Sequence, residues 1–200
     1  MILPIVVYGD PVLRKVGAEI DENYEGLQQL IKDMFETMYN ANGVGLAAPQ
    51  VGKAIRLFVI DTSPFAESED EDDDDEFTAE QKKELEAFKK VFINAQILDE
   101  SGKEWAFNEG CLSIPKIREN VNRLPEIEIE YYDENFKKHV EKYDGVIARV
   151  IQHEYDHIEG KLFTDRISPF KRKLISGKLN DIAKGKIFAD YKTKVYRPKK

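Results

Sequence analysis

Apolar residues between positions 27 and 38 recur every three or four places, which is the spacing of the buried face of an amphipathic helix. The set is Leu27, Leu30, Ile31, Met34, Phe35 and Met38. The pair Asn42-Gly43 follows, and these residue types commonly end a helix. The sequence therefore predicts a helix that begins near residue 27 and ends before Gly43.

Four later stretches have the length and pattern of strands. Residues 55–61 (IRLFVID) and 91–98 (VFINAQIL) are mostly apolar and predict buried strands. Residues 126–132 (EIEIEYY) alternate between charged and apolar positions, which predicts a half-exposed strand. Residues 137–143 are expected to return beside it as a hairpin partner.

Two helices are predicted near the C-terminus. In residues 145–157 one stripe of helical spacing holds Val146, Val150, His153 and His157. Further on, Ser168-Pro169 has the pattern of an N-cap followed by proline in the first turn. The residues of this last helix that are expected to face inward are Phe170, Leu174, Ile175 and Leu179.

The order of these elements favours an α+β fold in a single domain, residues 1–200, without internal repeats or linkers. We expect antiparallel or mixed sheets packed around the helix of residues 145–157, and a further C-terminal helix. With 200 residues, 42% of them hydrophobic, the chain can form a sizeable core. We expect no membrane span, because no segment approaches about 18 consecutive apolar residues. The N-terminus lacks the basic leader of a secretion signal, and a single cysteine fits a reducing cytoplasm.

The net charge of −8 comes from one segment. Residues 67–76 read ESEDEDDDDE, and without these nine acids the rest of the chain has 29 acidic and 30 basic residues. Such a run repels itself, so residues 66–76 are expected to form a solvated insertion loop whose replacement by a Gly/Ser linker leaves turnover unchanged. Residues 171–200, in contrast, hold eleven Lys or Arg and two Asp.

The stretch QHEYDHIEG at residues 152–160 contains the pattern H-E-x-x-H. On a helix, His153 and His157 share a face and can bind one metal ion, while Glu154 lies close enough to move a proton without being a ligand. Two histidines at this spacing can also occur by chance on a surface. The apolar stripe that precedes them argues for the metal site.

The third metal ligand distinguishes the enzyme classes. Phe163 stands where a metzincin has its last histidine, and a thermolysin-like site would have to use Asp181 or Asp190. His139 lies in a charged stretch and is expected at the surface. Cys111 remains: a lone cysteine is often only a small buried residue, but Gly110 and Pro115 beside it suggest a special backbone shape. One thiolate with two imidazoles would leave a fourth position open, as in catalytic sites.

At this point the chain resembles the peptide deformylases. Their three motifs are similar to GVGLAAPQ at residues 43–50, EGCLS at 109–113 and HEYDH at 153–157, and YGDPVLR at 8–14 is similar to the family's usual opening. The resemblance spans residues 5 to 167, and three motifs in register are highly specific. The acidic insertion departs from the typical pattern but falls between the motifs.

The resemblance implies a hydrolase that removes the N-formyl group from the N-terminal formylmethionine of new polypeptides and releases formate. Cys111, His153 and His157 would hold one divalent ion, usually Fe²⁺, for which Zn²⁺ or Ni²⁺ can substitute. Glu154 would be the general base, and Gln50 with the backbone N–H of Leu112 would form the oxyanion hole. The ribosome is an expected partner of the basic segment 184–200, whose removal should weaken that association with little effect on small peptides.

Five further residues are expected to bind the substrate. The glycines of the first motif allow close backbone approach, and a ligand strand could pair with the edge at Gly45. Val44, Val146 and Val150 are expected to line a pocket for the methionine side chain. Arg118 either contacts the substrate backbone, as the resemblance implies, or is an ordinary surface arginine. The direction of Arg149 stays open, and a zinc endopeptidase remains the alternative function.

Overall fold

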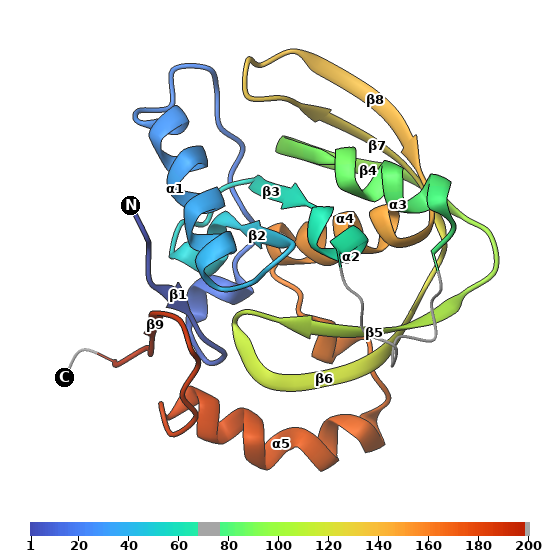
Figure 1. The fold of residues 1–200 in the computed structure, drawn as a ribbon. Coiled ribbons are helices and arrows are strands. Elements are labelled where there is room, and N and C mark those ends of the chain that lie inside the picture. The colour runs from blue at the N-terminus through green and yellow to red at the C-terminus, as the bar shows by residue number, and fades with distance from the viewer. Residues whose placement is uncertain (68–76, 199–200) are drawn as a thin grey trace.

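The computed structural model describes residues 1–67 and 77–198 (Figure 1). Residues 68–76, which make up most of the predicted acidic loop, lie outside the described residues. Two helices flank them in the sequence: α2 (Ser63–Glu67) and α3 (Ala79–Ala87). Thr78 caps α3, because its side chain accepts a hydrogen bond from the N–H of Gln81 at 3.2 Å.

The main sheet has five antiparallel strands in the order β2-β3-β4-β7-β8. Their bounds are β2 (Gly45–Ala47), β3 (Leu57–Asp61), β4 (Lys89–Ser101), β7 (Glu126–Tyr132) and β8 (Lys138–Tyr143). The predicted strands at 55–61, 91–98, 126–132 and 137–143 are thus confirmed, with ends shifted by up to three residues. In β7 buried residues alternate with exposed or half-buried ones, as the sequence predicts.

The strand β3 is buried along its whole length, so both faces of the sheet are covered at this strand. Leu57 and Val59 point to one face and pack in a cluster with the helix α1 (Leu27–Asn40). Phe58 and Ile60 point to the other face and pack with the helix α4 (Gly145–Ile158). The predicted helices at 27–42 and 145–157 are confirmed as these two elements.

A long hairpin lies across α4 from the sheet, formed by β5 (Trp105–Cys111) and β6 (Ile114–Arg123) (Figure 1). This hairpin was not predicted from the sequence, because its strands are rich in Asn, Glu, Lys and Arg, which interrupt the alternation of apolar residues. Arg149 of α4 donates hydrogen bonds to the Trp105 and Val121 carbonyl oxygens of the hairpin, at 2.7 and 2.8 Å. The helix α4 therefore contacts the sheet on one side and the hairpin on the other.

The last helix is α5 (Pro169–Ala183), and the Ser168 side chain caps it as predicted. Its inward face was only partly predicted. Leu179 is buried and Ile175 is half-buried, but Phe170 and Leu174 are 71% and 68% exposed. The prediction of these two residues as inward is wrong, because α5 packs through a narrow stripe near its C-terminal end, where Ile182 rather than Leu174 completes the contact.

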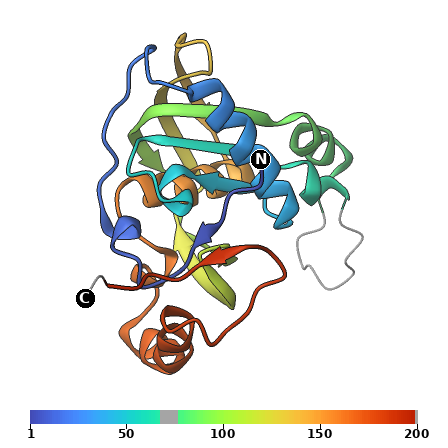
Figure 2. The ribbon, with the colours of Figure 1, turned by 90° about the vertical axis from the view of Figure 1, so that its left-hand side faces the viewer.

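The basic segment after α5 returns across the molecule and is not a free tail. The strand β9 (Thr193–Lys194) pairs in parallel with β1 (Ile5–Val6) near the N-terminus (Figures 1 and 2). Residues 184–198 therefore belong to the fold, so removing them takes away a strand as well as positive charge. Three short 3₁₀ helices complete the described elements: Pro11–Arg14, Ala48–Val51 and Phe163–Asp165.

The described helices include none with the length and apolar character needed to cross a membrane. Together, the three sheets and the helices form the single-domain α+β architecture that the sequence predicts.

Candidate metal centre and active site

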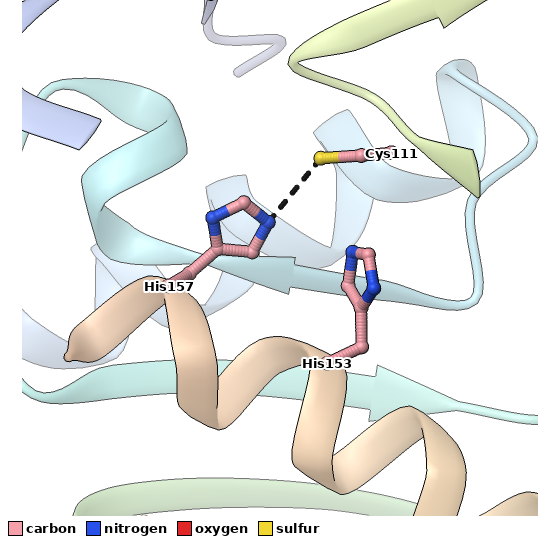
Figure 3. A group of neighbouring side chains, drawn as sticks. All are labelled: Cys111, His153 and His157. Atoms are coloured by element: carbon pink, nitrogen blue, oxygen red, sulfur yellow. Dashed lines mark hydrogen bonds between the residues drawn. The ribbon is translucent and has the colours of Figure 1, made fainter. Parts of the chain in front are cut away.

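Cys111, His153 and His157 converge between the hairpin and α4 (Figure 3). Cys111 is the last residue of β5, and the two histidines lie four apart on α4, so that both imidazoles leave the helix on one face. The Cys111 Sγ lies 3.3 Å from His157 Nε2. One ligand atom from each of the three residues lies within 4.8 Å of the other two.

The three side chains fit a divalent metal ion. A thiolate and two imidazoles, each about 2.0 to 2.3 Å from one ion, must lie only a few ångströms from one another, and they do. The rival ligand Asp181 lies on α5, is 47% exposed at its side chain and pairs with Lys186 at 3.4 Å. Among the described residues, the Cys/His/His group is the one with a metal-binding arrangement.

Glu109 determines the orientation of His153. The Nδ1 of His153 lies 2.9 Å from Glu109 Oε2, which leaves the Nε2 of the same ring for a metal ion. Arg123 donates two hydrogen bonds to the same carboxylate, at 2.7 and 2.9 Å. Burial alone would raise the pKa of Glu109, but the hydrogen bonds from Arg123 and His153 outweigh it and lower the pKa well below the usual range. Glu109 is therefore a buried anion.

The side chain of Arg149, whose direction the sequence left open, points into this buried network. Its side chain is 1% exposed, donates to Glu109 Oε1 at 3.0 Å, and lies 4.6 Å from the centre of the Trp105 ring. Asp156 of α4 extends the network, since it accepts hydrogen bonds from Arg123 at 2.7 Å and from Arg166. Charged side chains thus fix the hairpin to the metal-binding helix.

Glu154 is buried beside the metal-binding group and is not bonded to it. The residue is 4% exposed, and its Oε2 has no hydrogen-bond partner among the described residues. Burial raises the pKa of Glu154 to about 7. Gly45 makes this placement sterically feasible, because a Cβ at that position would lie 2.5 Å from Glu154 Oε1. A carboxyl group with a pKa near neutrality can both accept and release a proton.

Gln50 is held so that its amide nitrogen points at the metal-binding group. Its Oε1 accepts a hydrogen bond from the Ala47 N–H at 2.8 Å, which fixes the amide. Its Nε2 then lies 3.6 Å from Cys111 Sγ and 3.3 Å from Ser113 Oγ. Leu112 directly follows Cys111 in the turn between β5 and β6, so its backbone N–H is next to the same centre.

The three residues predicted to line the methionine pocket belong to one apolar cluster. Val146 and Val150 are buried in the cluster between α4 and the sheet, and Val44 packs against that cluster. Arg118 is different: it is exposed, lies opposite Gly110 in the hairpin, and donates to Asn108 Oδ1 at 2.6 Å. His139 is half-buried and pairs with Asp133 at 2.8 Å, in a part of the sheet that contributes nothing to this centre.

Glu109, Arg123 and Tyr191 also surround the site, and their roles there were not predicted from the sequence. One signal could have identified Glu109: it stands two residues before Cys111, so in an extended strand both side chains leave on the same face. Arg123 gives no comparable local signal, since its contact with Glu109 depends on the pairing of the hairpin. Tyr191 donates to the Leu112 carbonyl oxygen at 2.7 Å from 79 residues away, which no local pattern reveals.

Comparison with known proteins gives the family. A model of the polypeptide deformylase family matches residues 2–173. The peptide deformylase of Flavobacterium psychrophilum is 60% identical over 200 residues, which cover all of this chain and 100% of that protein. The peptide deformylase of Christiangramia forsetii is 58% identical over 200 residues, which cover all of this chain and 99% of that protein. The peptide deformylase structure from Thermus thermophilus is 36% identical, with a TM-score of 0.77 over 92% of this chain and 99% of that one. The chain belongs to the peptide deformylase family.

Proposed function

We propose that this protein hydrolyses the N-terminal formyl group of formylmethionyl peptides through Glu154, Gln50 and Leu112, at a metal ion held by Cys111, His153 and His157. The observation that carries this proposal is the environment of Glu154. A buried carboxyl group with an unpartnered oxygen stands beside a Cys/His/His group, and Gly45 leaves it the room to do so. Such a group is suited to proton transfer at that centre.

The residues around the metal-binding group support a bound divalent ion. Glu109 orients His153, and Gln50 Nε2 approaches the Cys111 sulfur. An ion in this place would supply Lewis acidity, which lowers the pKa of water and polarises the formyl oxygen. We propose Fe²⁺ as the ion, with Zn²⁺ or Ni²⁺ as substitutes, because imidazole and thiolate donors suit all three. Metal analysis of protein purified with and without oxygen tests this assignment.

Glu154 moves the proton in the proposed reaction. It accepts a proton from water as the water oxygen attacks the formyl carbon, and it delivers that proton to the amine nitrogen as the carbon–nitrogen bond breaks. The products are formate and a free N-terminal methionine. A carboxyl group with a pKa near 7 is suited to both steps, since it can accept a proton and release it again.

Two donors stabilise the oxygen that becomes negative during the attack. Gln50 Nε2 and the Leu112 backbone N–H both lie next to Cys111 and would donate hydrogen bonds to that oxygen. Gln50 is suited to this role because its amide is buried and fixed by the Ala47 N–H. Little reorganisation is then needed when the charge develops, which is the basis of this kind of catalysis.

The substrate is proposed to bind along β2 with its methionine side chain among Val44, Val146 and Val150. Among the described strands β2 is at the edge of the sheet and pairs only with β3, so an extended peptide can pair with it at Gly45. The helix α4 would then carry two of the three ligands, the base and two of the three pocket residues. Arg118 lies opposite Gly110, one residue before Cys111, and its guanidinium is exposed for contact with the peptide backbone.

We also propose that the protein acts in the cytoplasm on nascent chains and associates with the ribosome. Formylmethionine is present where chains emerge, and a free cysteine at the site fits a reducing compartment. The C-terminal helix exposes Phe170 and Leu174 together with lysines such as Lys173 and Lys178. Positive charge on this surface suits a phosphate-rich partner.

Formate release from a formyl-Met tripeptide tests the proposed function. The metal-loaded protein should release one formate per peptide and leave the internal peptide bonds intact. The matched substrate is the same tripeptide with an acetyl group in place of the formyl group, which should react far more slowly. Cleavage at an internal peptide bond without release of formate would instead support a zinc endopeptidase.

A further inference from the structure

A turn of two residues carries one of the proposed oxyanion donors. Leu112 and Ser113 connect β5 to β6, and Cys111 pairs with Ile114 across the turn. The Cys111 sulfur and the Leu112 N–H therefore move together with this turn. Any rocking of the turn would displace a metal ligand and an oxyanion donor at once, so what holds the turn in place bears on catalysis.

Both carbonyl groups of the turn are held from outside the hairpin. The Ser113 carbonyl oxygen accepts a hydrogen bond from the Tyr8 N–H at 2.8 Å. The Leu112 carbonyl oxygen accepts one from the Tyr191 hydroxyl at 2.7 Å. The first donor belongs to the N-terminal segment and the second to the segment after α5, which lies far away in sequence.

The two donors belong to segments that are paired with each other. Lys192 directly follows Tyr191, and its carbonyl oxygen accepts a hydrogen bond from the Ile5 N–H at 2.9 Å. Val7 directly precedes Tyr8, and its N–H donates to the Lys194 carbonyl oxygen at 3.1 Å. Tyr191 also packs against the apolar cluster of α1 and the sheet, as does the Leu112 side chain. The two paired chain ends therefore hold both carbonyl groups of the turn.

We propose that Tyr191 is a positioning residue for deformylation: its hydroxyl holds the Leu112 carbonyl group, which belongs to the peptide unit after the Leu112 N–H, and so keeps the turn where that N–H can donate to the formyl oxygen. This inference rests on the proposed function, in which Leu112 stabilises the oxyanion. Oxyanion donors act through precise placement, and small displacements reduce their effect. The basic C-terminal segment then has a role in turnover through Tyr191 that is separate from any role of its lysines.

Tyr191→Phe tests this inference in the full-length, metal-loaded protein, since it removes one hydroxyl and keeps the ring. The control is Tyr196→Phe, which removes the same group from the same segment at a residue that is 44% exposed. We expect Tyr191→Phe to lower kcat by about 3- to 10-fold, the worth of one net hydrogen bond. KM, metal content and the control should stay within about twofold of wild type.

Three results would overturn the inference. One is an unchanged kcat in Tyr191→Phe. The second is a fall in metal content that accounts for the lost activity, since the hydroxyl would then act through Cys111. The third is a rise in KM at constant kcat, which would assign Tyr191 to substrate binding. The proposed function fails separately, through absence of formate release by the wild-type protein.

Discussion

The Nδ1 of His153 lies 2.9 Å from Glu109 Oε2, and this contact determines which nitrogen of the ring faces Cys111. The carboxylate is itself held by Arg123 and Arg149, both almost fully buried. A ligand on α4 is thus oriented by a residue of β5 and by charges from β6 and α4. Changes in this network should alter metal binding without removing a ligand.

We therefore expect Glu109→Gln to weaken metal binding by about 10- to 100-fold, the usual effect of losing a carboxylate behind a ligating histidine. The amide keeps the size of the side chain but not its charge. Competition with a chromogenic chelator measures the effect. The control is Glu119→Gln on the opposing strand, where the carboxylate pairs with Lys171 of α5. Equal metal affinity in Glu109→Gln and wild type would contradict this role.

Gly45→Ala should lower kcat by at least about tenfold, because the added methyl group would lie 2.5 Å from Glu154 Oε1 and force the proposed base to move. The control is Gly177→Ala in α5, where a Cβ meets nothing within 4 Å. That variant should keep full activity and gain about 0.5 to 1 kcal/mol of stability, since alanine suits a helix interior better than glycine. Steady-state kinetics and urea unfolding compare the two. A fully active Gly45→Ala would show that Glu154 does not depend on this close approach.

Helices and strands with a regular spacing of apolar residues were predictable from the sequence. Contacts between residues distant in the sequence were not. The α4 stripe from Val146 to His157 is confirmed, because periodicity and buried packing agree there. The β5–β6 hairpin was not predicted, since its polar side chains pair with residues that are distant in the sequence. Glu109 and Arg123, for example, form a hydrogen bond across 14 residues. The wrong assignment of Leu174 has the same origin: an apolar side chain alone does not say which part of a helix meets the core.

The same limit applies to the site. Cys111 could be singled out from its motif, and the structure brings it to the two histidines. The contact of Tyr191 with Leu112 depends on the pairing of β1 with β9, two residues each, at opposite ends of the chain. Strands this short leave no readable pattern in a sequence. Their pairing depends on tertiary contacts, which the residues next to each strand in the sequence do not predict.

Glu141 should stabilise the fold in a pH-dependent way. Burial alone would raise its pKa, but hydrogen bonds from Lys90, Tyr131 and Tyr143 outweigh burial and lower it from 4.5 to about 2. A lowered folded-state pKa gives stability that is full above about pH 4.5 and is lost as the pH falls towards 2. Glu141→Gln should therefore unfold more easily than wild type at pH 7, and the difference should shrink at pH 3. Urea unfolding measures it, with Glu134→Gln at an exposed turn position as control. A difference that stays constant with pH would rule out this linkage.

Ribosome association should depend on the charges of α5. Because residues 184–198 include β9 and Tyr191, deletion would confuse binding with loss of structure. Charge reversal at the exposed Lys173 and Lys178 avoids this and should weaken salt-sensitive co-sedimentation with ribosomes while leaving formate release unchanged. The same change at Lys82 and Lys83 of α3 is the control. Equal binding by both double variants would reject α5 as the docking surface.

The last prediction separates the proposed base from the proposed ligands. Glu154→Gln keeps the size of the side chain and removes its proton acceptor, so this variant should bind one metal ion and the peptide normally while kcat falls by at least about 10²-fold. Cys111→Ser should instead lose metal, because a hydroxyl is a poor ligand compared with a thiolate, and His153→Ala and His157→Ala should do the same.

Metal content by elemental analysis, measured together with formate release, distinguishes the two classes of variant. The control is Glu86→Gln at an exposed position of α3, which should retain both metal and activity. If Cys111→Ser kept its metal as tightly as wild type and still released formate, the thiolate would not be a ligand. The metal site would then have to be rebuilt around another carboxylate such as Asp181, which lies on α5 in a pair with Lys186.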